Sequence, residues 1–244
     1  MRESESNGRI AYIRQQEAAY HEACYSKHAL FAPGSWLHKP VKTVLEGLEY
    51  LQDREALRVL DLGSGVGRNA IPIAQTIAAR GGTVVCVDLL QSALDQLMRY
   101  SAEHGVMHGI ETRLADIDHF EIGESDYDYS IAVSTLEHVS SEAIFERKLG
   151  ELARGTRTGG AVCLIIGSNQ REVDAESGSD LDPLFEVLLS TERLQATIND
   201  TFRGWNVKRF HVRQLAFDIE RNGRAVKLYS DVVTFLALND HPGM

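Results

Sequence analysis

Residues 59–69 read VLDLGSGVGRN, a short apolar run followed by a turn with three glycines. The run 58–62 predicts a buried β-strand, and the apolar spacing after residue 69 predicts that a helix follows the turn. Glycines at 63, 65 and 67 remove side chains where the backbone must approach a ligand closely. Because the first turn of a helix also offers unpaired N–H groups, the stretch predicts a ligand-binding turn between a strand and a helix.

A carboxylate ends the next predicted strand. Residues 83–89 are rich in β-branched side chains and include Asp88 and then Leu89 at their end. A carboxylate at this position can accept two hydrogen bonds from the hydroxyls of a ribose, as in dinucleotide-binding folds. The two stretches together therefore favour a ligand that contains a nucleoside.

The spacing of the glycines distinguishes between classes of nucleotide site. The dinucleotide fingerprint GxGxxG requires a glycine where Arg68 stands, and no Lys-Ser or Lys-Thr pair follows for a P-loop. Asp61 precedes the first glycine, where it would repel a pyrophosphate but would tolerate a sulfonium or ammonium cation. The turn therefore favours a cationic ligand over a pyrophosphate.

The rest of the chain predicts strands that alternate with helices and then a hairpin. Alternation of this kind indicates a parallel sheet covered on both faces, with further strands expected at 110–115, 129–134 and 159–166. Two long β-like runs, 206–219 and 225–238, are joined by Asn222-Gly223, a strong hairpin signal. The acidic segment 171–186 is expected to be a loop, and residues 1–57 are expected to be helical.

Composition limits the classes of function. The net charge of −10 over 244 residues disfavours a broad nucleic-acid groove. Three widely spaced cysteines form neither a zinc pattern nor a disulfide framework, which favours a reducing cytoplasm. The polar N-terminus does not read as a signal peptide, and no apolar run is long enough to span a bilayer.

With these motifs in order, the sequence resembles the class I S-adenosylmethionine-dependent methyltransferases over residues 58–239. Their motifs match Asp61 to Gly67, Asp88, Asp116 after the third strand, and STLEHV at 134–139, which resembles the small-molecule branch of ubiquinone-type and tellurite-resistance-type enzymes. The resemblance implies an α/β fold with a Rossmann-like, doubly wound, seven-stranded sheet, mostly parallel with a C-terminal antiparallel hairpin. Residues 58–244 would form the methyltransferase domain, behind an N-terminal helical cap at 1–57.

The resemblance also implies the cofactor S-adenosylmethionine and a set of residues that hold it. The backbone at 63–65 would bind the methionine part, Asp88 the ribose hydroxyls and Asp116 the adenine amino group, with Ile117 against the ring and Ser134 beside the sulfonium. The implied set is Asp61, Gly63, Ser64, Gly65, Asn69, Asp88, Leu89, Asp116, Ile117 and Ser134. The partner of the cofactor's carboxylate stays open among Arg14, Trp36 and Lys39.

The methyl group of this cofactor is already activated, so no metal is expected, and catalysis would come mostly from in-line positioning. His138 is the catalytic candidate, as a general base or as a structural residue at a helix start. Tyr20, His28 and Trp36 are candidate substrate contacts, from an N-terminal segment that either closes over the substrate or only packs.

The expected function is transfer of the methyl group to a small-molecule nucleophile. Two alternatives stay open: a non-catalytic sensor or scaffold that binds the cofactor, and a nicotinamide-dependent oxidoreductase. A small-molecule acceptor is the expected partner, with neither nucleic acid nor membrane. The acceptor atom and the oligomeric state are not determined by the sequence.

Overall fold

The computed structural model describes residues 2–221 and 223–240, with side chains from residue 8 onward. A single mixed sheet runs through the molecule in the order β3-β2-β1-β4-β5-β8-β7. Its strands are β1 (Arg58–Leu62), β2 (Thr83–Asp88), β3 (Ile110–Leu114), β4 (Tyr127–Val133), β5 (Thr156–Asp174), β7 (Asn206–Arg221) and β8 (Arg224–Leu238). The first five on this path are parallel, whereas β8 and β7 are antiparallel. The predicted Rossmann-like sheet with a terminal hairpin is therefore confirmed.

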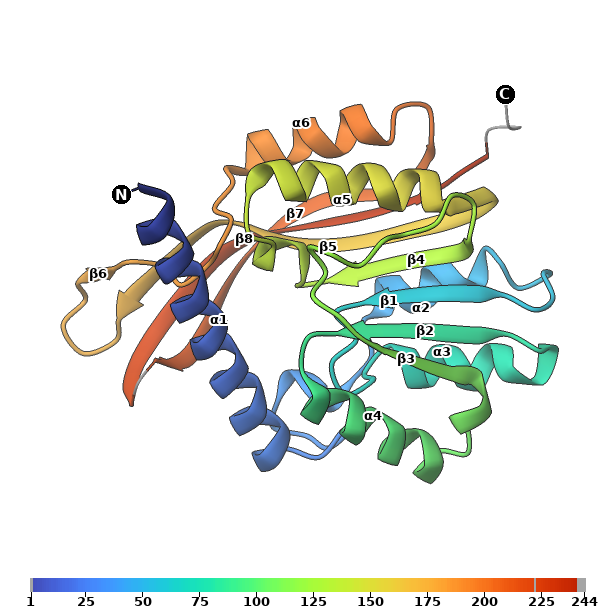
Figure 1. The fold of residues 1–244 in the computed structure, drawn as a ribbon, viewed down its shortest axis with the longest axis horizontal. Helices are drawn as coiled ribbons and strands as arrows, with labels where there is room; N and C mark the ends of the chain where they lie inside the picture. The colour runs from blue at the N-terminus through green and yellow to red at the C-terminus, as the bar shows by residue number, and fades with distance from the viewer. Residues whose placement is uncertain (1, 222, 241–244) are drawn as a thin grey trace.

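Helices cover both faces of the sheet (Figure 1). One face carries α2 (Lys42–Glu49), α3 (Ala70–Ile77) and α4 (Gln91–Glu103), and the other carries α5 (Glu142–Gly155) and α6 (Thr191–Thr201). Alternate residues of one strand point to opposite faces of the sheet. Val84 of β2 packs into the hydrophobic cluster on the α2–α3–α4 face, and Val85 packs into the cluster on the α5–α6 face. Strands buried on both faces explain why the central strands read as continuous apolar runs.

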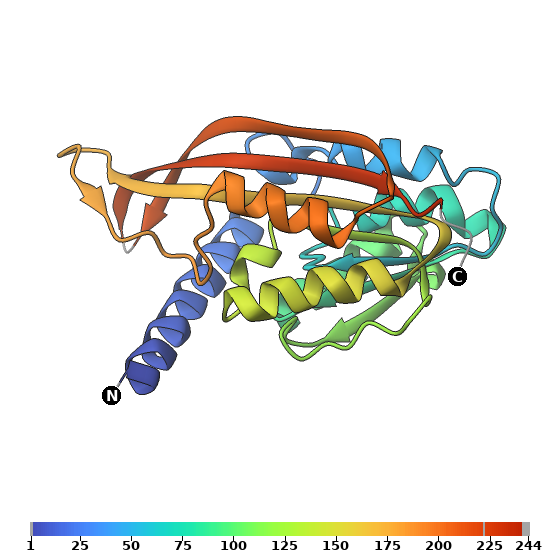
Figure 2. The ribbon, with the colours of Figure 1, turned by 90° about the horizontal axis from the view of Figure 1, so that it is seen from above.

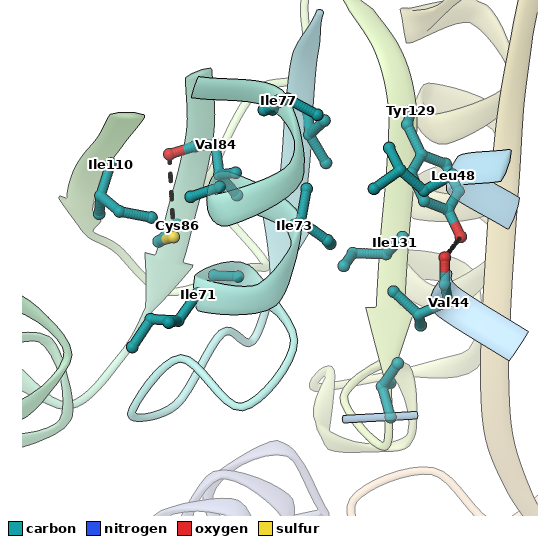
Figure 3. Close-up of a cluster of buried hydrophobic side chains, with 14 of the residues drawn as sticks. Val44, Leu48, Ile71, Ile73, Ile77, Val84, Cys86, Ile110, Tyr129 and Ile131 are labelled. Carbon is teal, nitrogen blue, oxygen red and sulfur yellow. Dashed lines mark hydrogen bonds between the residues drawn. The ribbon is translucent and has the colours of Figure 1, made fainter. Parts of the chain in front are cut away.

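The hydrophobic cluster on the α2–α3–α4 face holds α2 against the sheet (Figure 3). The hydroxyl of Tyr129 on β4 donates a hydrogen bond of 2.9 Å to the carbonyl of Val44. A Cβ at Gly47 would lie 2.2 Å from that hydroxyl oxygen, so only a glycine lets the helix approach this closely. The second half of the N-terminal segment is thus packed into the same core as α3.

Three strands continue well beyond the carboxyl ends of the others (Figures 1 and 2). Pairing of β4 with β5 ends at Val133 and Ile165, but β5 stays paired with β8 as far as Asp174. The two-residue strand β6 (Asp180–Leu181) pairs with the end of β5. The expectation of a loop over 171–186 was therefore wrong in part, because residues 167–174 are too polar to read as a strand and gain their hydrogen bonds from a partner far along the chain.

The long helix α1 (Arg2–Lys27) lies beside the carboxyl ends of the parallel strands (Figure 1). It contacts α4 and also β7, one of the three strands that extend beyond the others; the far parts of β5, β7 and β8 are called the sheet extension below. An ion pair of 2.7 Å between Arg221 and Glu17 joins it to the extension. None of the helices in the described part of the chain is both long and apolar enough to cross a membrane.

Candidate functional site

The glycine turn after β1 is held against the end of β2 by backbone hydrogen bonds. The N–H groups of Gly63 and Ser64 both donate to the carbonyl of Val87, at 2.8 and 3.0 Å. Gly63 has φ +74°, and a Cβ there would lie 2.1 Å from the hydroxyl oxygen of Thr135. A side chain at position 63 would therefore be both strained and obstructed, which explains the glycine.

Asp88 lies at the end of β2, and its carboxylate orders the turn. Its Oδ2 accepts the N–H of Gly65 at 2.8 Å, and its Oδ1 accepts the N–H of Leu90 at 2.9 Å. Burial raises the pKa of Asp88, although the hydrogen bonds from Leu90 and Gly65 counteract part of that effect. Each carboxylate oxygen can accept a further hydrogen bond, so the turn still leaves acceptors for a diol.

Two polar side chains, one at the end of β1 and one in the turn, keep atoms without hydrogen-bond partners. Asp61 is 1% exposed with Oδ2 unpartnered, and the Oγ of Ser64 is also buried without a partner. Burial raises the pKa of Asp61 to about 7, against the attraction of Arg68 and with a smaller contribution from Asp88. Buried polar atoms without partners are rare in native folds, so these atoms fit a ligand with a positive charge and hydrogen-bonding groups, as S-adenosylmethionine has.

Arg68 stands where a dinucleotide fold would have its third glycine. Its guanidinium lies 5.0 Å from the centre of the Trp36 ring and donates a 2.9 Å hydrogen bond to the carbonyl of Trp36. The Trp36 ring in turn packs edge-on against Tyr25. The hydroxyl of Tyr25 lies 2.9 Å from where a Cβ on Gly65 would be, so the N-terminal segment lies directly against the glycine turn.

Asp116 follows β3 and forms an ion pair with α1. Arg14 Nη1 lies 2.6 Å from its Oδ2, and Arg14 Nη2 lies 3.1 Å from Asp118 Oδ2. The Oδ1 of Asp116 accepts the N–H of Asp118 at 2.9 Å. Burial lowers the pKa of Arg14, but Asp116, Asp118 and Glu186 together outweigh it and the net pKa is raised. Arg14 is thus already paired with these carboxylates.

The other implied cofactor residues surround the same edge of the sheet. Leu89 is 48% exposed directly after Asp88, whereas Ile117 is buried in the hydrophobic cluster on the α5–α6 face. Ser134 has φ +52°, and its N–H donates to the carbonyl of Ile165. The side chain of Asn69 accepts the N–H of Val41 at 3.0 Å, so it ties the start of α3 to the segment before α2.

His138 lies in the one-turn helix η4 (Leu136–His138) after β4. Its Nδ1 lies 3.1 Å from Glu186 Oε2, and its ring stacks on Phe185 at 5.6 Å. Burial alone would lower the pKa of His138, but the hydrogen bond to Glu186 and the charges of Glu17 and Glu137 raise it to about 9. At neutral pH the ring is therefore protonated and is a poor general base.

Aromatic side chains of α1 gather near this point, but the three implied substrate residues do not all meet. The rings of Tyr20 and Trp36 both contact His21 edge-on, at 5.5 and 6.0 Å. His21 is close enough to His138 for their charges to affect one another, and its own pKa is lowered chiefly by burial. The His28 ring instead lies beside Gly34, in the turn after α1.

Sequence reasoning missed Glu186 and Asp118, and it left the role of Arg14 open. Glu186 lies in the long polar connection after β6, with no periodic pattern to mark it. Asp118 receives the N–H of Ser140 as well as Arg14, contacts more than 20 residues apart in sequence. In the part of the chain that the structure describes, no cluster of three or more His, Cys, Asp or Glu is arranged to hold a metal.

The central part of the chain matches a known family. Residues 59–160 match the family model described as a methyltransferase domain. The chain is similar to the ubiquinone biosynthesis O-methyltransferases of Rickettsia conorii, 31% identical over 90 residues, and of Methylocella silvestris, 31% identical over 100 residues. These matches cover 36% and 41% of this chain, and they span 28% and 37% of the two relatives.

Solved structures share the fold over a larger part of the chain. The crystal structure of TehB from Haemophilus influenzae has a TM-score of 0.57 with 18% identity, over 79% of this chain and 61% of that one. At this identity the likeness concerns the fold alone. The motif order and the sheet topology agree with the family match, which makes residues 59–160 of this chain similar to a methyltransferase domain.

Proposed function

We propose that the whole chain is an S-adenosylmethionine-dependent methyltransferase that acts on a small-molecule nucleophile. One observation carries the proposal: Asp61 and Ser64 keep buried, unpartnered polar atoms in a glycine turn whose order depends on Asp88. The names of the curated relatives, which are O-methyltransferases, favour oxygen as the methyl acceptor.

Each residue at the carboxyl ends of the parallel strands has a proposed role. The turn at 63–65 presents backbone groups to the methionine part, the carboxylate of Asp88 accepts the ribose hydroxyls, and Asp116 accepts the adenine amino group. Asp61 offers negative charge to a cationic ligand. The cofactor supplies a methyl group that is already activated on sulfur. His138, protonated and fixed by Glu186, donates a hydrogen bond toward the acceptor.

The N-terminal residues 1–57 act as a cap in this proposal, and residues 58–244 form the catalytic unit. Support comes from α1, which is joined to the carboxyl edge by Arg14 and to the sheet extension by Glu17. A cover of this kind excludes water from the reacting groups. Tyr20 and Trp36 present apolar ring faces with polar tips, which suits an organic acceptor.

We also propose a cytoplasmic location and no nucleic-acid partner. Cys24, Cys86 and Cys163 are free, and Cys86 and Cys163 are buried. Burial raises the pKa of Cys163 to about 12, so this thiol stays protonated and unreactive. The net charge of −10 opposes contact with phosphate backbones.

Transfer of a labelled methyl group tests the proposal. The full chain is incubated with methyl-labelled S-adenosylmethionine and a small-molecule extract, and the label is followed into extracted compounds. We expect incorporation that depends on the chain and falls sharply in Asp88→Ala. Cofactor binding without incorporation into any compound would instead identify a sensor or scaffold.

A further inference from the structure

Two buried side chains, in and near η4, keep polar atoms without hydrogen-bond partners. Gln170 on β5 is 8% exposed, and both Nε2 and Oε1 of its amide are unpartnered. Glu137 is 5% exposed, and its Oε2 is unpartnered. Leaving such groups buried and unpaired opposes folding, so native proteins almost always satisfy them. A ligand that binds here would supply the missing partners.

Both side chains converge on Gly167. Its N–H donates to Glu137 Oε1 at 3.1 Å, which fixes that carboxylate and leaves its Oε2 without a partner. A Cβ on Gly167 would lie 2.8 Å from Gln170 Nε2 and 3.3 Å from Glu137 Oε1. The bare glycine therefore lets the amide and the carboxylate approach the same point.

A local irregularity of β5 places Gln170 there. The register between β5 and β8 shifts between Ser168 and Arg171, and Asn169 has φ +47°. A bulge of this kind redirects the side chains that follow it. The amide of Gln170 thus lies beside Gly167, whose N–H donates to Glu137 of η4.

The charges around this point select the class of ligand. The cations around it are already paired: Arg221 with Glu17 and Glu172, Arg14 with carboxylates of the edge, and the protonated His138 with Glu186. An anionic group would face Glu137 with no unpaired cation to compensate it. An uncharged or cationic group that both donates and accepts hydrogen bonds would satisfy Gln170 and Glu137 together.

We propose that Glu137 and Gln170 form the subsite for the methyl acceptor and recognise a hydroxyl or amine group; this rests on the proposed methyltransferase function. The acceptor donates its hydrogen to Glu137 Oε2, while the Gln170 amide fixes the orientation of the acceptor. As the acceptor oxygen or nitrogen forms its bond to the methyl carbon, the carbon–sulfur bond breaks and its electron pair stays on sulfur. The acceptor's proton passes to Glu137, which becomes a neutral acid. Burial raises the pKa of Glu137, which makes its carboxylate a stronger base.

Two substitutions test the subsite without removing the contacts that hold the fold. Gln170→Leu removes the unpartnered amide at similar size, and Glu137→Gln keeps an oxygen to accept the Gly167 N–H. Gln214→Leu is the matched control, because Gln214 is an exposed residue of β7. The probes are benzyl alcohol, benzylamine and benzoate, whose rings suit the aromatic side chains of α1. Their binding is followed by saturation-transfer NMR on the full chain with S-adenosylhomocysteine, together with the melting temperature.

We expect the alcohol and the amine to bind at least tenfold more tightly than benzoate. Gln170→Leu and Glu137→Gln should lose at least tenfold in affinity for them, with S-adenosylhomocysteine affinity unchanged and the control like the original chain. The melting temperature of Gln170→Leu should stay level or rise by a few degrees, because an unsatisfied group is gone. Unchanged probe affinity in both variants would overturn the subsite, as would tight benzoate binding. If the original chain fails to bind S-adenosylhomocysteine at all, the proposed function itself falls.

Discussion

Arg14 of α1 and Asp116 after β3 form an ion pair of 2.6 Å, although they are 102 residues apart in the chain. This contact places the N-terminal helix at the carboxylate that the family resemblance assigns to the adenine. The proposed cap and the proposed adenine-binding residue are thus physically joined, and we expect the motion of α1 to depend on what occupies the site.

Removal of the Arg14 guanidinium should loosen α1. An ion pair with partly exposed side chains contributes about 1 kcal/mol, so we expect amide exchange over residues 8–27 to be about fivefold faster in Arg14→Gln. Mass spectrometry of exchanged peptides measures this directly. Arg9→Gln is the control, because Arg9 pairs with the exposed Asp182. S-adenosylmethionine should slow exchange over the same residues of the original chain, and equal rates with and without it would exclude α1 as a cap.

Asp88→Ala should weaken cofactor binding while the chain stays folded. Hydrogen bonds to a charged group contribute roughly 1.5–3 kcal/mol each, so the affinity should fall by about tenfold to a few hundredfold. The glycine turn also loses the acceptor of the Gly65 N–H, which adds to the effect. Asp95→Ala, an exposed change on α4, is the matched control in calorimetry. Equal affinity in a folded Asp88→Ala chain would make Asp88 a turn residue only.

Asp61 should make stability and cofactor affinity depend on pH in opposite directions. Its pKa is about 7 in the fold and 3.8 otherwise, so the folded chain binds more protons between these values and loses stability as the pH rises through them. The difference corresponds to on the order of 4 kcal/mol. Denaturant unfolding of Asp61→Asn should lack this loss.

A cationic ligand prefers the ionised Asp61, so S-adenosylmethionine affinity should rise from pH 6 to pH 8. The rise should flatten in Asp61→Asn. A pH profile that is the same in both chains would show that Asp61 does not face the cofactor's charge.

The His138 ring should titrate near pH 9, as measured by NMR of its ring protons. Because this pKa is raised by Glu186, Glu186→Gln should bring it down toward the ordinary value near 6.5. The stability from this pair is complete below about pH 6.5 and is lost as the pH rises through 9. The exposed His108 gives an internal reference signal. A His138 pKa that stays near 9 in Glu186→Gln would show that other carboxylates hold the proton.

The central sheet could be predicted because its signals are local. A buried strand such as β2 shows its apolar run, and the turn at 63–67 shows its glycines, within a few residues of sequence. The hairpin of β7 and β8 was equally visible through Asn222-Gly223, although residue 222 lies outside the described residues. Each of these features follows from a short-range rule of backbone conformation or burial.

The pairings across the site could not be predicted, because nothing local encodes them. Glu186 reads as one more acid in a polar segment, yet it sets the protonation of His138, 48 residues away. Gln170 lies in a polar stretch whose strand character comes from pairing with β8. Such contacts depend on the register of distant strands and on where α1 lies, which only the three-dimensional arrangement specifies.

Calorimetric titration of the full chain with S-adenosylmethionine and, in parallel, with NAD tests the central claim most directly. The glycine turn, with Arg68 in place of a third glycine and Asp61 at its start, predicts binding of S-adenosylmethionine and none of NAD. Binding of NAD without binding of S-adenosylmethionine would contradict the account.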